Sequence, residues 1–150
     1  MPTRLDELLP TASDLMTKVA LAEAEEASKH AAKLAEAEAE KKALLDRLKK
    51  PSGISDDEAI QRAVKIIERA VNNGRTEVQV HRFPNALCTD SGRAINQQEP
   101  GWETTLTGVP REIYQLWAKY FRSRGYKLRV EIIDFPGGKP GDIAMTLKWD

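Results

Sequence analysis

The sequence predicts an α+β protein in which a long N-terminal helix precedes a small two-layer domain. Residues 13–49 are rich in Ala, Glu, Lys and Leu and contain neither Gly nor Pro, and these residue types have a low cost of adopting a helix. After Pro51, one helical apolar period and several segments of period two follow. We therefore expect residues 1–50 to form an extended helical arm, and residues 51–150 to form an α+β domain. Its sheet should have three to four largely antiparallel strands, covered on one face by two helices.

The arm is expected to be one helix over residues 13–49. Thr11 and Ser13 are candidate N-caps, and basic residues near Lys49 suit the negative end of the helix dipole. The large apolar residues gather at the two ends, and alanine fills the middle: Leu15, Met16, Val19 and Leu21, then Leu44, Leu45 and Leu48. A coiled coil requires branched apolar residues over several heptads. Two roles for the arm therefore remain as alternatives: a solvated spacer helix, and self-association through the leucine-rich ends.

The domain is expected to begin with a helix at Ser55. Ser55 and Glu58 form the spacing of a capping box, and Gly74 supplies a left-handed stop. An apolar stripe at helical spacing predicts the buried face of this helix: Ile60, Val64, Ile67 and Val71, flanked by Ala63, Ile66 and Ala70.

A half-buried strand is expected next, over residues 76–83. Its alternation places Val78 and Val80 on one face and Glu77, Gln79 and His81 on the other. Residues 102–107 alternate less clearly and fit either a short strand or an extended entry into a helix.

That helix should start near Pro110 and end at Gly125, with an apolar stripe that docks onto the sheet. Two alternating segments, 127–132 and 143–149, are joined by a Gly- and Pro-rich loop and predict an antiparallel hairpin.

Composition excludes several partners. The chain has 23 basic and 23 acidic residues and a formal net charge of zero, whereas proteins that bind duplex nucleic acid or anionic membranes usually carry an excess of Lys and Arg. Its apolar runs are far shorter than the roughly 18–20 residues that span a bilayer. With no secretory signal pattern and a single cysteine, we expect a cytoplasmic protein that binds neither metal nor cofactor.

Residues 84–101 form a long segment without a clear period. Loops longer than about 12–15 residues in a small domain are usually functional or disordered, and apolar anchors argue against disorder here. The segment and the tryptophan after it offer polar and aromatic contacts for a ligand: Asn85, Asp90, Ser91, Arg93, Asn96 and Trp102. The alternative is a packed structural loop with a helical turn near Gly92–Gln98.

Two other groups of residues suggest chemistry. Cys88 and His81 are the types needed for a thiol nucleophile with a general base, although a lone cysteine beside leucine is more often a small buried apolar residue. Five basic residues alternate with aromatics and could hold single-stranded nucleic acid: Lys119, Arg122, Arg124, Lys127 and Arg129. The alternative for these five is a solvated face around a helix C-terminus.

Without a convergent catalytic set, the leading hypothesis is a non-enzymatic interaction or adaptor protein. In this hypothesis the arm serves for spacing, docking or self-association, with a protein partner or a second copy, and the 84–101 loop forms the binding surface. A small hydrolase or transferase using Cys88 and His81 is the first alternative, and a module that binds single-stranded nucleic acid through the basic cluster is the second.

Overall fold

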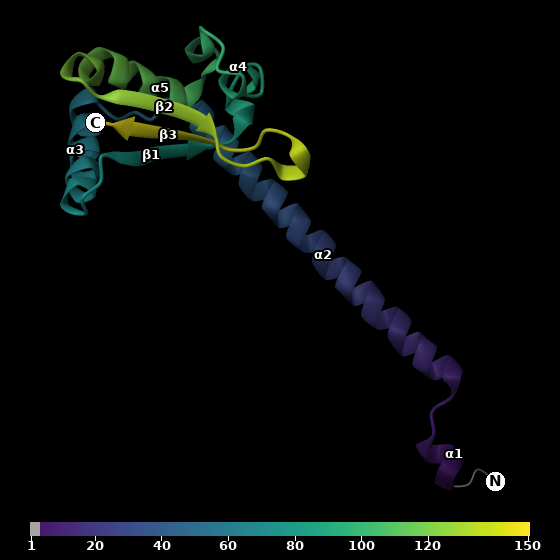
Figure 1. Cartoon of the computed structure of the whole chain (residues 1–150). Helices are drawn as coiled ribbons and strands as arrows, with labels where there is room; N and C mark the ends of the chain where they lie inside the picture. The colour runs from purple at the N-terminus through teal and green to yellow at the C-terminus, as the bar shows by residue number, and fades with distance from the viewer. Residues whose placement is uncertain (1–3) are drawn as a thin grey trace. The chain divides into compact units, whose positions relative to one another are not determined.

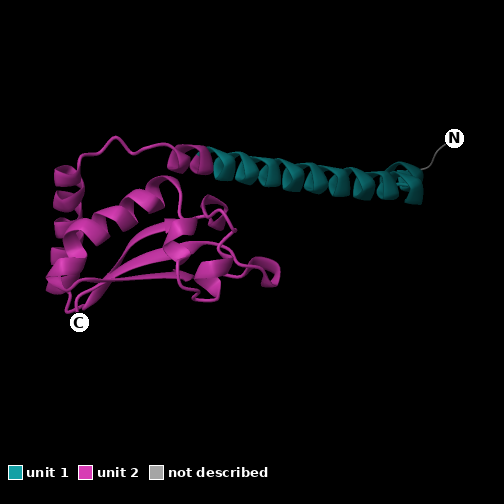
Figure 2. Cartoon of the chain, turned by 90° about the horizontal axis from the view of Figure 1, so that it is seen from above, with its two compact units in different colours: residues 1–43 teal, residues 44–150 magenta. Residues whose placement is uncertain are grey.

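A computed structural model describes residues 4–150, which confirm the predicted α+β class. The chain divides into two compact units, 1–43 and 44–150, which are described separately (Figures 1 and 2). The helices are α1 (Arg4–Leu8), α2 (Ala12–Lys49), α3 (Asp56–Asn72), α4 (Arg93–Asn96) and α5 (Gly108–Leu116), and the strands are β1 (Glu77–Phe83), β2 (Lys127–Ile132) and β3 (Ile143–Lys148).

The first unit contains α1 and most of α2. The Oγ1 of Thr11 accepts a hydrogen bond from the Asp14 backbone N–H at 3.1 Å, which confirms Thr11 as an N-cap. The short helix α1 was not anticipated, because five residues are too few for a helical period to be recognised. Pro10 separates it from α2.

The last turns of α2 belong to the second unit, which begins at Leu44. Leu48 joins the core cluster, and Leu44 and Leu45 pack against that cluster. These residues therefore fold with the domain, upstream of the predicted boundary at residue 50.

Helix α3 begins and ends where the sequence predicts. The Ser55 Oγ accepts a hydrogen bond from the Glu58 backbone N–H, and Gly74 has a φ of 73°. The buried face, however, differs from the predicted stripe. Val64 and Val71 are 41% and 52% exposed, whereas Ala70 is buried. The prediction for these two valines is wrong because α3 turns its alanine side toward the rest of the domain.

The sheet has the strand order β1-β3-β2, and both pairings are antiparallel (Figure 1). The predicted hairpin of β2 and β3 is confirmed, and β1 is added on the other side of β3. Residues Trp102–Thr105 form a 3-10 helix, η2, instead of a strand, and Leu106 makes a single bridge to Cys88. The optional fourth strand is therefore not formed within residues 4–150.

A β-bulge in β1 places His81 on the opposite face from the one predicted. Gln79 pairs with Thr146 and His81 pairs with Met145, so Val80 is an extra residue in the ladder. Because the side-chain period of a strand is two, one inserted residue reverses the alternation after it. His81 consequently shares a face with Phe83 and stacks on it, with 5.7 Å between the ring centroids.

The core lies on this face of the sheet. Phe83, Ile143 and Met145 are almost fully buried there, together with Leu87, Cys88, Ile95 and Leu106 from the following segments. On the other face, long side chains from the edge strands β1 and β2 cover the central strand β3. Arg129 pairs with Glu77 and Glu131, and Thr146 of β3 is buried although it is polar.

The helix that starts at α5 changes its winding before it ends. Residues Trp117–Phe121 (η3) form a π-helical turn and Arg122–Arg124 (η4) a 3-10 turn, and Gly125 ends the element at a φ of 90°. The predicted stop at Gly125 is confirmed. π-helical turns are rare and frequently occur at functional sites.

Candidate functional site: a groove between α3 and α5

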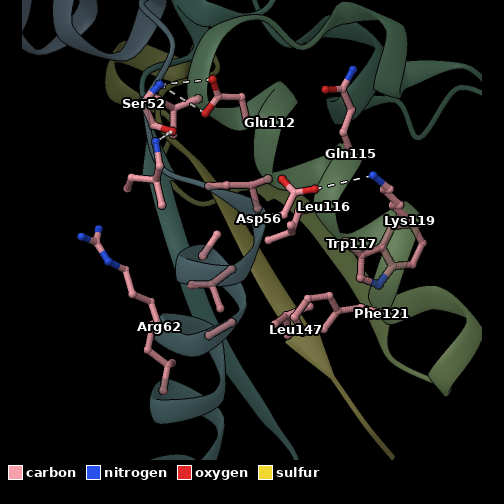
Figure 3. Close-up of a pocket in the computed structure, with 17 residues that line it drawn as sticks. Ser52, Asp56, Arg62, Glu112, Gln115, Leu116, Trp117, Lys119, Phe121 and Leu147 are labelled. Atoms are coloured by element: carbon pink, nitrogen blue, oxygen red, sulfur yellow. Dashed lines mark hydrogen bonds and ion pairs between the residues drawn. The ribbon is translucent and has the colours of Figure 1, made fainter.

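An apolar groove separates α3 from α5 in the second unit. Its volume is about 590 Å³, within the range of about 300–1,000 Å³ typical of ligand sites. One wall comes from α3, the other from α5 and η3, and Val80 and Leu147 of the sheet contribute to the floor (Figure 3). The two helices that cover this face therefore leave a gap between them.

The floor and walls of the groove are mainly apolar. Small residues on α3, Ala59 and Ala63, face larger ones on the opposite wall, among them Ile113 and Leu116. The alanines are the reason that the space is not filled, because a methyl group reaches too short a distance to close the gap between two helices.

Charged residues at the rim are all engaged within the domain. Lys119 lies 3.6 Å from Asp56, and the Tyr120 hydroxyl also donates a hydrogen bond to Asp56. Glu112 accepts a hydrogen bond from the backbone N–H of Ser52 at 3.2 Å. Figure 3 shows the Asp56–Lys119 pair and the Ser52–Glu112 hydrogen bond.

The remaining rim charge, Arg62, pairs with Glu58 at 2.9 Å. Contact with Tyr120 and the charge of Asp56 raise the pKa of Lys119, so its ammonium group stays charged. The rim, as described, therefore offers no unpaired charge to a ligand.

The π-helical turn positions the aromatic part of the wall. Trp117 and Phe121 both line the groove, and Trp117 is fixed by a hydrogen bond from its Nε1–H to the Tyr126 carbonyl at 3.1 Å. The guanidinium of Arg122 stacks 4.5 Å from the Trp117 ring. A wall held by a hydrogen bond and a cation–π contact is pre-organised for binding.

The residues predicted to bind a ligand in the 84–101 loop do not converge on this groove. The Asn85 side chain donates to the carbonyls of Ser91 and Pro140, and the Asp90 carboxylate accepts from the backbone of Gly92 and Ala94. These bonds tie the loop to itself and to the Pro140 segment.

The other candidates from this segment are dispersed. Trp102 packs edge-on against Tyr114, with ring centroids 5.7 Å apart, whereas Arg93 and Asn96 are exposed on α4. The arrangement favours the alternative of a packed structural loop, with Leu87 and Ile95 as its buried anchors.

Cys88 and His81 do not form an activated pair. Burial raises the pKa of the Cys88 thiol to about 11, so the thiolate that nucleophilic attack requires is scarce near neutral pH. The Nε2 atom of His81 is buried and has no hydrogen-bond partner among the described residues. Neither residue lines the groove.

The five predicted nucleic-acid residues lie on different parts of the domain. Lys119, Arg122 and Arg124 follow α5, whereas Lys127 and Arg129 are on β2, on the face away from the core. Each makes a contact within the domain: Lys119 with Asp56, Arg122 with Tyr114 and Trp117, Arg124 with the Tyr120 carbonyl, Lys127 with the Asp150 carbonyl, and Arg129 with Glu77 and Glu131. The five side chains are therefore all engaged within the domain.

The buried imidazole leads to a pH-dependent stability. Burial lowers the pKa of His81 below its ordinary value of 6.5. The imidazole therefore binds a proton more readily in the unfolded chain than in the folded protein. The stability present above pH 6.5 is lost as the pH falls through the pKa that His81 has in the folded protein.

We accordingly expect His81→Phe, which keeps the stacking on Phe83, to reduce the loss of unfolding free energy between about pH 8 and about pH 5. Urea unfolding at a series of pH values measures this loss. The same substitution at His30, which is exposed on α2, is the control. An equal pH dependence in wild type and His81→Phe would contradict the expectation.

The groove itself was missed by sequence reasoning. The apolar pattern of the sequence assigns the alanine side of α3 to the flank of a buried stripe. Small residues at helical spacing are the one feature of the sequence that could have indicated a gap between two helices. Metal sites and membrane spans were not found in the part of the chain that the structure describes. Residues 4–150 contain no cluster of three or more His, Cys, Asp or Glu side chains that could hold a metal ion. None of the helices in this range combines the length and the apolar character that crossing a bilayer requires.

Comparisons of the chain with protein-family models, with curated proteins and with solved structures found no match. The functional proposal therefore depends on the geometry of the groove.

Proposed function

We propose that this chain is a non-enzymatic interaction protein that binds the apolar face of a partner helix in the groove between α3 and α5. The observation that carries the proposal is an unfilled apolar groove of about 590 Å³ whose rim charges are already paired. A cytoplasmic location suits it, because the single cysteine is a buried free thiol.

The chemistry of the groove selects the kind of partner. A charged ligand would have to displace the Asp56–Lys119 pair or the Glu112–Ser52 hydrogen bond, whereas apolar side chains bury floor residues without breaking either. Residues of two helices and of the sheet line the groove. Apolar grooves commonly receive an amphipathic helix with apolar anchors at positions i, i+3 and i+4.

A model peptide tests the proposal. The probe is a fluorescein-labelled Ala/Lys helical peptide with Leu at i, i+3, i+4 and i+7, titrated with the full chain and followed by fluorescence anisotropy. Ala63 lines the groove, and Ala63→Gln fills it while costing only a few tenths of a kcal/mol in helix propensity. We expect this variant to bind at least about tenfold more weakly, equivalent to about 1.4 kcal/mol.

Ala31→Gln is the matched control, since Ala31 is an exposed alanine of the helix α2. Its affinity should equal that of the wild type, and urea unfolding of both variants should show that the fold is retained. Equal affinities of wild type and Ala63→Gln, or no binding by the wild type, would refute the proposal.

A further inference from the structure

We infer that the segment Arg4–Leu9 of one copy of this chain docks in the α3/α5 groove of a second copy, so that the protein self-associates. This segment, called the leucine segment below, carries Leu5, Leu8 and Leu9. The inference rests on the proposed function of the groove and names its occupant.

The leucine segment is apolar and uncovered. Its three leucines are 73%, 65% and 76% exposed, respectively. Three large apolar side chains on one short segment form the kind of exposed patch that usually marks a contact with another molecule. A second copy of the chain can supply that contact, because each copy carries both a leucine segment and a groove.

The spacing of the leucines matches the groove. Positions 5, 8 and 9 have the i, i+3, i+4 relation of anchors in helix-in-groove recognition. Leu5 and Leu8 lie on α1, and Leu9 follows its last residue directly. Exposed apolar residues also gather at the start of α2, at Leu15, Met16, Val19 and Leu21, whereas Leu34 stands alone in an alanine-rich stretch.

The leucine segment is short enough to fit within the groove. The residues of α3 that line the groove run from Asp56 to Ile66, which is about 15 Å at 1.5 Å per residue. Leu5 and Leu9 are about 6 Å apart along a helix axis. A longer occupant that also placed Val19 in the groove would need about 21 Å as a continuous helix, and Pro10 interrupts such a helix.

Charge does not oppose the docking. The rim charges of the groove pair within the second unit, as Asp56 does with Lys119, and the charges of the leucine segment, Arg4, Asp6 and Glu7, lie between or before the leucines. Each chain supplies one leucine segment and one groove, so reciprocal exchange gives a closed dimer and one-way exchange gives an open chain of copies.

Light scattering after size exclusion tests the inference on the full chain. We expect the wild type to form a dimer or larger species that dissociates on dilution, and Leu8→Ser and Ala63→Gln each to be monomeric at the same concentration. Leu34→Ser, at a leucine that is 53% exposed on α2, and Ala31→Gln are the matched controls and should behave like the wild type.

A binding measurement separates this inference from the proposed function. A labelled peptide of residues 4–11 should bind the variant in which Leu5, Leu8 and Leu9 are all Ser, because its grooves have no competing segment. It should not bind when Ala63→Gln is added. The same triple variant should bind the model Ala/Lys peptide more tightly than the wild type does.

Several results would overturn the inference. The inference fails if the wild type is monomeric at every concentration and the 4–11 peptide does not bind. Association that survives Ala63→Gln but is lost in Leu8→Ser would indicate helix-to-helix pairing of the arms, and association lost in Ala63→Gln alone would indicate another occupant. If the model Ala/Lys peptide still binds when the inference fails, the proposed function of the groove stands. If that peptide does not bind either, the inference and the proposed function both fail.

Discussion

Phe83→Ala is expected to destabilise the protein by about 3–5 kcal/mol, the range measured for deleting a buried aromatic ring. Phe83 is 1% exposed, pairs with Ile143 across β1 and β3, and stacks on His81. Removing its ring leaves a cavity in the core cluster, and β3 cannot collapse into it without breaking the β1–β3 ladder.

Urea unfolding followed by circular dichroism measures this loss, and Phe135→Ala provides the control. Phe135 is 53% exposed in the loop between β2 and β3, so its truncation should change the unfolding free energy by less than about 0.5 kcal/mol. Similar losses for the two variants would show that the core does not lie where β1 and β3 meet.

Gly108→Ala is expected to cost about 4 kcal/mol or more, a size of effect that indicates a specific structural conflict. A Cβ atom on Gly108 would overlap the carbonyl oxygen of Leu48 and lie 3.0 Å from the Cα of Lys49. Gly108 also has a φ of 60°, where an L side chain is strained. The substitution therefore separates the start of α5 from the last turn of α2, both within the second unit.

Gly101→Ala isolates the contribution of backbone strain. Gly101 has a φ of 83°, but a Cβ there would meet no atom within 4 Å, so we expect a loss of only about 1–2 kcal/mol. The difference between the two unfolding free energies reports the steric conflict with Leu48. Equal losses would mean that α5 and the end of α2 are not in close contact.

Capping and termination could be predicted because they depend on residues within one turn of each other. Ser55 caps α3, Thr11 caps α2 and Gly125 ends the helix after α5, in each case as the local sequence indicates. The hairpin of β2 and β3 was also predictable, since one loop rich in Gly and Pro, residues 133–142, joins two segments of period two.

The candidate site could not be predicted in the same way. The polar residues of the 84–101 loop suggested a ligand site, but Asn85 and Asp90 use their side chains to hold the loop. A sequence gives the hydrogen-bonding capacity of a residue and does not give the distance to its partners, so a structural amide and a ligand-binding amide look alike.

The sequence by itself determined the class of this protein, the position of nearly every helix and strand, and the separation of a long helix from a small domain, because periodicity and capping are local properties of the chain. Tertiary structure alone decided the addition of β1 to β3, the bulge that turns His81 toward the core, and the groove between α3 and α5. Each of these depends on which residues distant in sequence meet. The groove depends also on whether a small residue such as Ala63 faces a neighbour that fills the space or one that leaves it open.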